Sequence, residues 1–271
     1  MQELLNNPAV QGGLAPFVIA LIVAELLLRL RLSGLAVVAG FAVTVFLVSD
    51  FSIEPLTSSR KIVLLGLLSA LLALTLTRFN WRPLRWILAI AGSIATVWMA
   101  LRILQQQEMT QMVIWGGGCA LYVGWLIYWM DTLHESPVRA GSAGMALGLG
   151  TGGAALFGAS ALLGQFGLAL GAAASAYLLL LVLSNTRLPC GRNFTLPLSL
   201  IAGMTGCLAV LSAQLPWYAL ALLAVIPLAA KISLPEKMGL WMQALLLTMA
   251  ALTCAAGAIY LTWFVAGAPP F

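Results

Sequence analysis

Residues 166–186, FGLALGAAASAYLLLLVLSNT, carry no charged side chain over 21 consecutive positions. A helix needs about 20 apolar residues to cross the hydrocarbon core of a bilayer. A helix on the surface of a soluble protein would instead place charged side chains along the face turned to water. This segment therefore predicts a transmembrane helix.

The rest of the chain has the same character. Hydrophobic residues make up 62% of the sequence, charged residues only 8%, and the mean hydropathy is +1.04. A soluble domain carries about 25% charged residues. The composition predicts an integral membrane protein whose main partner is the lipid bilayer. Its basic residues are scattered through short loops and form no stripe interleaved with aromatic residues, so no nucleic-acid partner is expected.

Breaks in hydropathy divide the chain into ten apolar segments of about the length of a span. The expected spans are residues 15–32, 34–50, 61–78, 84–104, 111–130, 138–163, 166–186, 195–213, 216–231 and 238–265. The predicted fold is an all-α, polytopic transmembrane helix bundle of about ten spans with short loops.

We expect one transmembrane domain over residues 15–265, between a short extracytoplasmic N-terminal segment (1–14) and a short C-terminal tail (266–271). Residues 1–13 contain no Lys or Arg. A secretory signal needs a basic N-terminal region, so the first apolar segment is expected to remain as a permanent span.

The distribution of basic residues predicts the orientation. With the N-terminus outside, ten of the 13 Lys and Arg residues fall in inner loops, and three fall outside: Arg60, Lys61 and Arg102. The positive-inside rule therefore predicts that both termini face outward, in a multi-pass protein of a bacterial inner (plasma) membrane. Two blocks of five spans would enter the membrane from opposite sides, which permits a 5+5 inverted repeat.

Residue types that carry common chemistry are scarce. His134 is the one histidine, and it lies in the polar segment 131–135, where we expect it to be solvated. The four cysteines show no CxxC spacing. Haem held by paired histidines and a HExxH zinc site are excluded in their usual forms. No metal and no cofactor are expected.

Glu25 is the one clear carboxylate inside a predicted span. A charge at membrane depth is a candidate for a substrate or ion pathway. Alternatively, Glu25 pairs with Arg29, which lies four residues later on the same helix face.

The densest polar segment on the predicted outer side lies between the second and third spans. Its charged members are Asp50, Glu54, Arg60 and Lys61. Two carboxylates and two cations near a helix N-terminus are candidate contacts for a zwitterionic or phosphorylated ligand. The alternative is an ordinary capped loop at the membrane surface.

Gly116, Gly117 and Gly118 interrupt the fifth span. They predict either a discontinuous helix, whose freed backbone groups contact a substrate or ion, or a close approach of another helix. A second set of glycines, Gly144, Gly148 and Gly152, has the four-residue spacing of a tight helix contact.

Two functions remain open. The first is a transporter or channel-like permease for a small solute, consistent with the helix number and the glycine-interrupted span. The alternative is a non-catalytic structural or assembly subunit of a larger membrane complex, consistent with the few polar groups inside the spans. Its partners would be other membrane subunits or a second copy of the chain. An enzyme is the least favoured interpretation, since no acid–base pair or metal cluster is evident.

Overall fold

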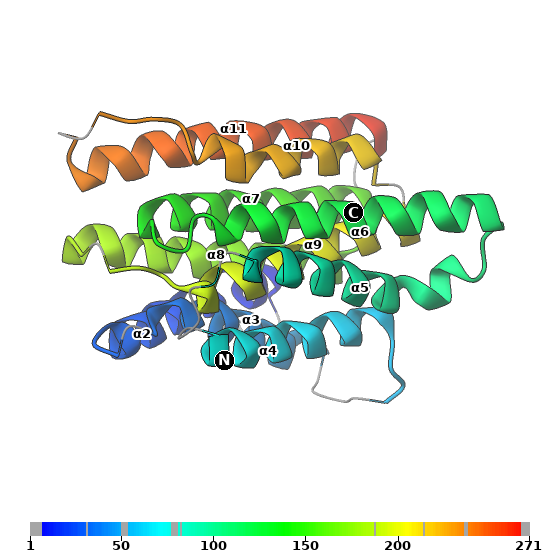
Figure 1. The fold of residues 1–271 in the computed structure, drawn as a ribbon, viewed down its shortest axis with the longest axis horizontal. Helices are drawn as coiled ribbons and strands as arrows, with labels where there is room; N and C mark the ends of the chain where they lie inside the picture. The colour runs from blue at the N-terminus through cyan, green and yellow to red at the C-terminus, as the bar shows by residue number, and fades with distance from the viewer. Residues whose placement is uncertain are drawn as a thin grey trace.

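The computed structural model describes residues 7–30, 32–49, 54–76, 81, 83–186, 188–213, 215–235 and 238–266. Over these residues the fold is helical and contains no strand, which confirms the all-α class (Figure 1). Ten α-helices lie at the ten predicted positions. They are α2 (Ala15–Leu28), α3 (Ala36–Ser49), α4 (Ser58–Leu76), α5 (Leu84–Leu104), α6 (Met109–Asp131), α7 (Pro137–Gly158), α8 (Ala161–Ser184), α9 (Arg192–Ser212), α10 (Trp217–Ala229) and α11 (Leu240–Ala266). A π-helical turn, η1 (Val10–Leu14), leads into α2, and a 3-10 turn, η2 (Ser33–Leu35), leads into α3.

Seven helices of the described chain are long and apolar enough to cross a membrane: Val10–Leu28, α4, α5, α6, α8, α9 and α11. Helices α3 and α10 are apolar but shorter. Helix α7 has 22 residues, but seven of them are glycines, which lower its hydropathy. The fold is thus compatible with a membrane helix bundle.

Local sequence signals explain several helix ends. Pro137 opens α7 directly after Ser136, as the first turn of a helix favours. Residues 188–191 are not helical, and Gly191 has a φ of 72°, which glycine adopts without strain. The break between α7 and α8 comes several residues earlier than predicted, because the Ser160 hydroxyl caps α8 by accepting from the Leu163 amide at 3.3 Å.

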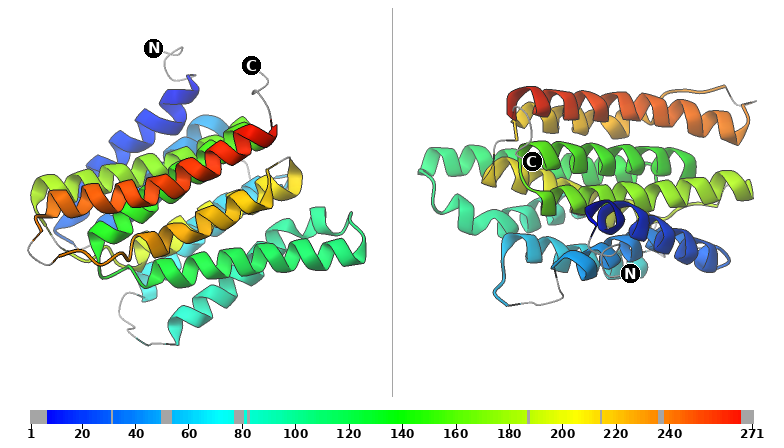
Figure 2. Two further views of the ribbon diagram at one scale, coloured as in Figure 1. Left: turned by 90° about the horizontal axis from the view of Figure 1, so that it is seen from above. Right: turned by 180° about the vertical axis from the view of Figure 1, so that it is seen from behind.

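Helix α9 is the central element of the bundle (Figures 1 and 2). Every residue from Arg192 to Ala209 is buried. The helix packs mainly against α4, α6 and α7, and also against α8. Helices buried on all sides normally carry few polar residues, so the polar side chains of α9 need an explanation.

Helices α7 and α8 form the most extensive contact of the fold. A Cβ atom on Gly148 would lie 2.2 Å from the Gly171 nitrogen, and one on Gly152 would lie 2.3 Å from the Leu168 nitrogen. The predicted packing role is confirmed for these two glycines. Gly144 faces α9 instead, where its Cβ would meet Leu198.

One end of the bundle gathers most of the described basic residues, and we call it the basic end. Here α5, α7 and α9 begin and α2, α6 and α10 end. Its described basic residues are Arg29, Arg85, Arg139, Arg192 and Lys231. The opposite end, where α4 begins and α5 ends, holds Arg60, Lys61 and Arg102.

Both ends of the described helical chain lie at the opposite end (Figure 2). Near the start of the chain, the Gln165 amide of α8 lies 3.4 Å from Gln11. Near its end, a Cβ on Gly158, the last residue of α7, would lie 2.6 Å from Thr262 of α11. An even number of helices that alternate in direction brings the two ends of the chain to the same end of the bundle.

Candidate functional site

Helix α9 carries a series of polar side chains through the interior of the bundle. The buried polar members on this helix are Arg192, Asn193, Thr195, Ser199 and Thr205. Ser199 donates to the backbone carbonyl of Thr195 at 2.7 Å. Both amide atoms of Asn193 and the hydroxyls of Thr195 and Thr205 have no hydrogen-bond partner among the described residues. Buried polar groups without a partner destabilise a fold by about 1–3 kcal/mol each.

An ion network lies at the basic end, where α9 begins. Asp131, the last residue of α6, accepts from the Arg192 Nε at 2.8 Å, and the Arg85 Nε lies 3.3 Å from its other oxygen. The side chains of Asp131 and Arg192 are 3% and 5% exposed, whereas Arg85 is 36% exposed. One buried carboxylate thus holds together the ends of α5, α6 and α9.

Asn193 lies on another side of the same turn, facing η2. A Cβ on Gly34 would lie 2.9 Å from the Asn193 Oδ1 and 2.6 Å from the Cys190 carbonyl oxygen, so only glycine lets η2 approach this closely. Tyr177 of α8 packs on Phe194, with ring centroids 4.8 Å apart, and its buried hydroxyl lies beside the Ser33 side chain of η2. Within the described residues, the two unpartnered amide atoms of Asn193 therefore lie where α8, α9 and η2 meet.

The Cys190 thiol beside this cluster is chemically quiet. It is fully buried and donates to the His134 carbonyl at 3.2 Å. Burial raises the pKa of the Cys190 thiol well above its usual range. A thiol that stays protonated is a poor nucleophile.

A second group of polar side chains lies deeper in the bundle. A Cβ on Gly206 of α9 would lie 3.7 Å from the Tyr122 ring of α6 and 3.8 Å from the Thr151 side chain of α7. The hydroxyls of Tyr122 and Thr151 are buried and unpartnered within the described chain. Gly206 is 14 residues beyond Arg192, or about 21 Å at 1.5 Å per residue. The unpartnered groups thus extend over much of the length of α9.

Glu25 lies outside this interior. It is exposed on α2, where Ile22, Leu26 and Arg29 line the same surface recess. In the described part of the chain, Glu25 and Arg29 form no ion pair, so the predicted pairing is not seen. The pathway role of Glu25 stays a prediction.

The described residues that were predicted to contact a ligand on the outer side do not converge on one site. Arg60 donates to the Pro55 carbonyl at 2.8 Å and, with Phe166, lines a cavity of about 220 Å³. Lys61 is buried and turns toward α5, where its Nζ donates to the Trp98 carbonyl at 2.9 Å. Glu54 is exposed, and Asp50 lies outside the described residues.

Helix α6 runs without a break through Gly116, Gly117 and Gly118, so the predicted discontinuous helix is not seen. Gly117 and Gly118 are exposed, and a Cβ on either would meet nothing within 4 Å. A Cβ on Gly116 would lie 3.2 Å from Leu104 of α5, which is the close helix contact predicted as the alternative.

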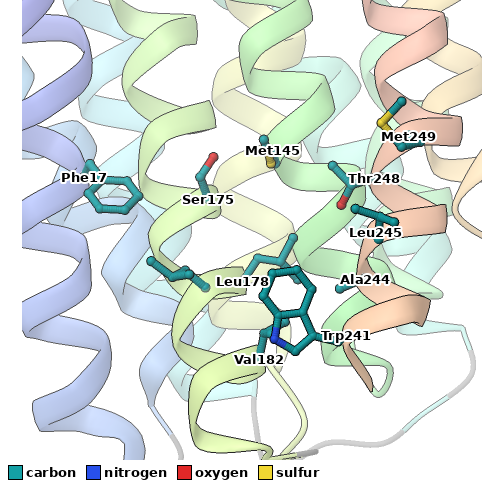
Figure 3. A pocket seen from close by; sticks show the side chains of 11 residues that line it. Phe17, Met145, Ser175, Leu178, Val182, Trp241, Ala244, Leu245, Thr248 and Met249 are labelled. Carbon is teal, nitrogen blue, oxygen red and sulfur yellow. The ribbon is translucent and has the colours of Figure 1, made fainter. Parts of the chain in front are cut away.

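An apolar groove of about 320 Å³ lies between α8 and α11, with Phe17 of α2 at its far side (Figure 3). The two hydroxyls that line it have partners elsewhere: Ser175 donates to the Gly171 carbonyl at 2.7 Å, and Thr248 to the Ser142 hydroxyl at 3.0 Å. Both hydroxyls are therefore engaged within the protein, and the groove offers mainly apolar contact.

The ion network at the basic end was missed by reasoning from the sequence. Asp131 and Arg192 were placed in connecting loops, whereas they are the last residue of α6 and the first of α9. His134 was expected to be solvated, which is wrong: its side chain is 13% exposed, and its ring contacts the Asp131 carbonyl. The sequence signal that could have indicated this network is Asp131, an acidic residue directly after the apolar segment 111–130.

No protein-family model, curated protein or solved structure matches this chain.

Proposed function

We propose that the chain is a multi-pass membrane transporter or channel-like permease for a small polar solute, with α9 lining its pathway. The observation that carries the proposal is the series of buried, unpartnered polar atoms along α9 and its neighbours. Lipid offers these atoms no hydrogen bonds, so they would destabilise a purely structural bundle. Polar groups inside a membrane domain are typical of paths for water, ions or solutes.

In this proposal the structure represents an occluded conformation. Every residue from Arg192 to Ala209 is buried, so α9 has no continuous contact with the surface. The ion network of Asp131, Arg85 and Arg192 closes the basic end. Opening would require α5 or α6 to move away from the start of α9, since these helices supply the other members of the network.

All ten helices would cross the membrane, with both termini outside the cytoplasm of a bacterial cell. The described residues support this orientation, because five basic residues lie at the basic end and three at the opposite end. Helices α2–α6 and α7–α11 would then form the two blocks of five that an inverted repeat requires.

Reporter fusions test this orientation. A reporter fused after Phe271 is expected to lie outside the cytoplasm, and one inserted in the connection 188–191 is expected to lie inside it. Two reporters in the same compartment would mean that one helix does not cross. A fusion in the loop between α7 and α8, at Ala159, is the control and should match Phe271.

Native cysteines test whether α9 lines a pathway. Cys207 is buried on α9, whereas Cys254 lies on α11 and is partly exposed on the bundle. In intact membranes, Cys207 as the sole cysteine is expected to react slowly with a charged, membrane-impermeant thiol reagent, because opening admits water to it. Cys254 as the sole cysteine should not react, since lipid excludes the reagent.

The alternative of a non-catalytic assembly subunit predicts a different result. A bundle that never opens would leave Cys207 unlabelled for hours, although it reacts fully once the protein is unfolded in detergent. That outcome would overturn the transporter proposal. Equal labelling of Cys207 and Cys254 would also count against it, since it would show general loosening of the bundle rather than a pathway.

A further inference from the structure

The basic end holds more positive charge than its acids balance. Around Asp131 gather Arg85, Arg192, Arg139 and Lys231, which come from the ends of α5, α9, α7 and α10. Of the other described carboxylates at this end, Glu25 is exposed on α2, and Glu135 is 69% exposed and lies 3.7 Å from the His134 ring. Arg85 and Arg192 share Asp131, which leaves Arg139 and Lys231 without a carboxylate partner in the described chain.

Two contacts hold these cations near one another. Arg139 donates through Nη1 to the Ala230 carbonyl at 2.9 Å, which ties it to the residue before Lys231. The Lys231 Nζ lies 4.2 Å from the centre of the Trp129 ring, two residues before Asp131 on α6. Arg85, Arg139 and Lys231 therefore face one small region between α5, α6, α7 and α10.

The pKa of Lys231 reflects the closeness of these cations. Its pKa is lowered, first by burial and then by repulsion from Arg85 and Arg139. A nearby anion would relieve this repulsion. Within the described chain, the fold supplies no second buried carboxylate for that purpose.

The aromatic residues around the cations are those of a membrane interface. Trp86 packs on Tyr128 with ring centroids 4.6 Å apart, and Tyr128 packs on Trp129 at 5.5 Å. Trp86 is exposed on the bundle surface. Tryptophan and tyrosine concentrate at the level of lipid headgroups.

We propose that Arg85, Arg139 and Lys231 form a binding site for the phosphate group of an anionic phospholipid. Basic pockets between transmembrane helices on the cytoplasmic side are suited to such headgroups. The lipid acyl chains would lie along the apolar surface beside Trp86. The site shares Arg85 with the ion network at the start of α9, but it does not depend on a transport function.

Lipid titration of the purified full-length chain tests the proposal. We expect added phosphatidylglycerol to raise the melting temperature in detergent, whereas phosphatidylcholine, whose choline the cations repel, should not. Lys231→Gln should shift the midpoint of the phosphatidylglycerol titration to about fivefold higher lipid, and Arg139→Gln with Lys231→Gln to about 25-fold higher. Lys231→Arg keeps the charge and should keep the wild-type midpoint.

Arg29→Gln is the matched control, because Arg29 lies at the same end but outside the cluster. It should leave the midpoint unchanged. The midpoint is compared rather than the starting melting temperature, since Arg139 also donates to the Ala230 carbonyl. An unchanged midpoint in Lys231→Gln would overturn the site. Equal stabilisation by inorganic phosphate would overturn the lipid assignment, because it would show that the cations bind free phosphate.

Discussion

Gly148→Ala is expected to destabilise the bundle by about 3 kcal/mol, although alanine is the better helix former. The new Cβ would lie 2.2 Å from the Gly171 nitrogen and 2.6 Å from its Cα. These are backbone atoms, so no side-chain rotation relieves the clash, and α7 and α8 must separate. The close packing that lipid cannot replace would be lost along the most extensive helix contact of the fold. Thermal unfolding in detergent measures the effect.

Gly117→Ala is the matched control for this change. Gly117 also lies inside a long helix, but it is exposed, and a Cβ there meets nothing within 4 Å. The helix propensity of alanine should then leave stability unchanged or raise it by up to about 1 kcal/mol. Equal melting temperatures for the two variants would contradict the assigned α7–α8 contact.

Helix positions follow from the sequence because length and hydropathy are local properties. The 21 uncharged residues of 166–186 contain most of α8, and Ser136–Pro137 marks the start of α7. The four-residue glycine spacing also predicted a contact. It did not predict the partner: Gly148 faces α8, whereas Gly144 faces α9. Which neighbour a helix face meets depends on how distant segments assemble.

The polar interior could not be predicted for the same reason. Thr151, Thr205 and Tyr122 are ordinary residues within apolar segments, and only the bundle leaves their hydroxyls buried without partners. Glu25 stood out in the sequence because it is charged, yet α2 turns it outward. Asp131 and Arg192 are 61 positions apart, so no spacing rule linked them.

Asp131→Ala is expected to destabilise the protein by about 3–5 kcal/mol, since it leaves the buried guanidinium of Arg192 without its carboxylate. Arg192 is 5% exposed and cannot recover hydration without moving the start of α9. Arg85, at 36% exposure, can turn toward water and should contribute less. The melting temperature in detergent should fall by about 10 °C. Glu135→Ala in the same connection is the control and should change stability by less than about 1 kcal/mol, because Glu135 is largely exposed.

A double variant distinguishes two contributions to stability: the pairing of the buried charges and the packing around them. Asp131→Leu with Arg192→Met removes both charges and fills similar volume, so it should recover most of the stability that Asp131→Ala loses. If the double variant were no more stable than Asp131→Ala, the loss would come from packing at the end of α6 rather than from removal of the carboxylate beside Arg192. A wild-type melting temperature for Asp131→Ala would show that the network contributes nothing to holding α5, α6 and α9 together. Under the proposed function, the network closes the basic end of the α9 pathway. The double variant should therefore fold and yet expose the start of α9 to water. Its two apolar side chains lack the directed contacts that join Asp131 to Arg85 and Arg192.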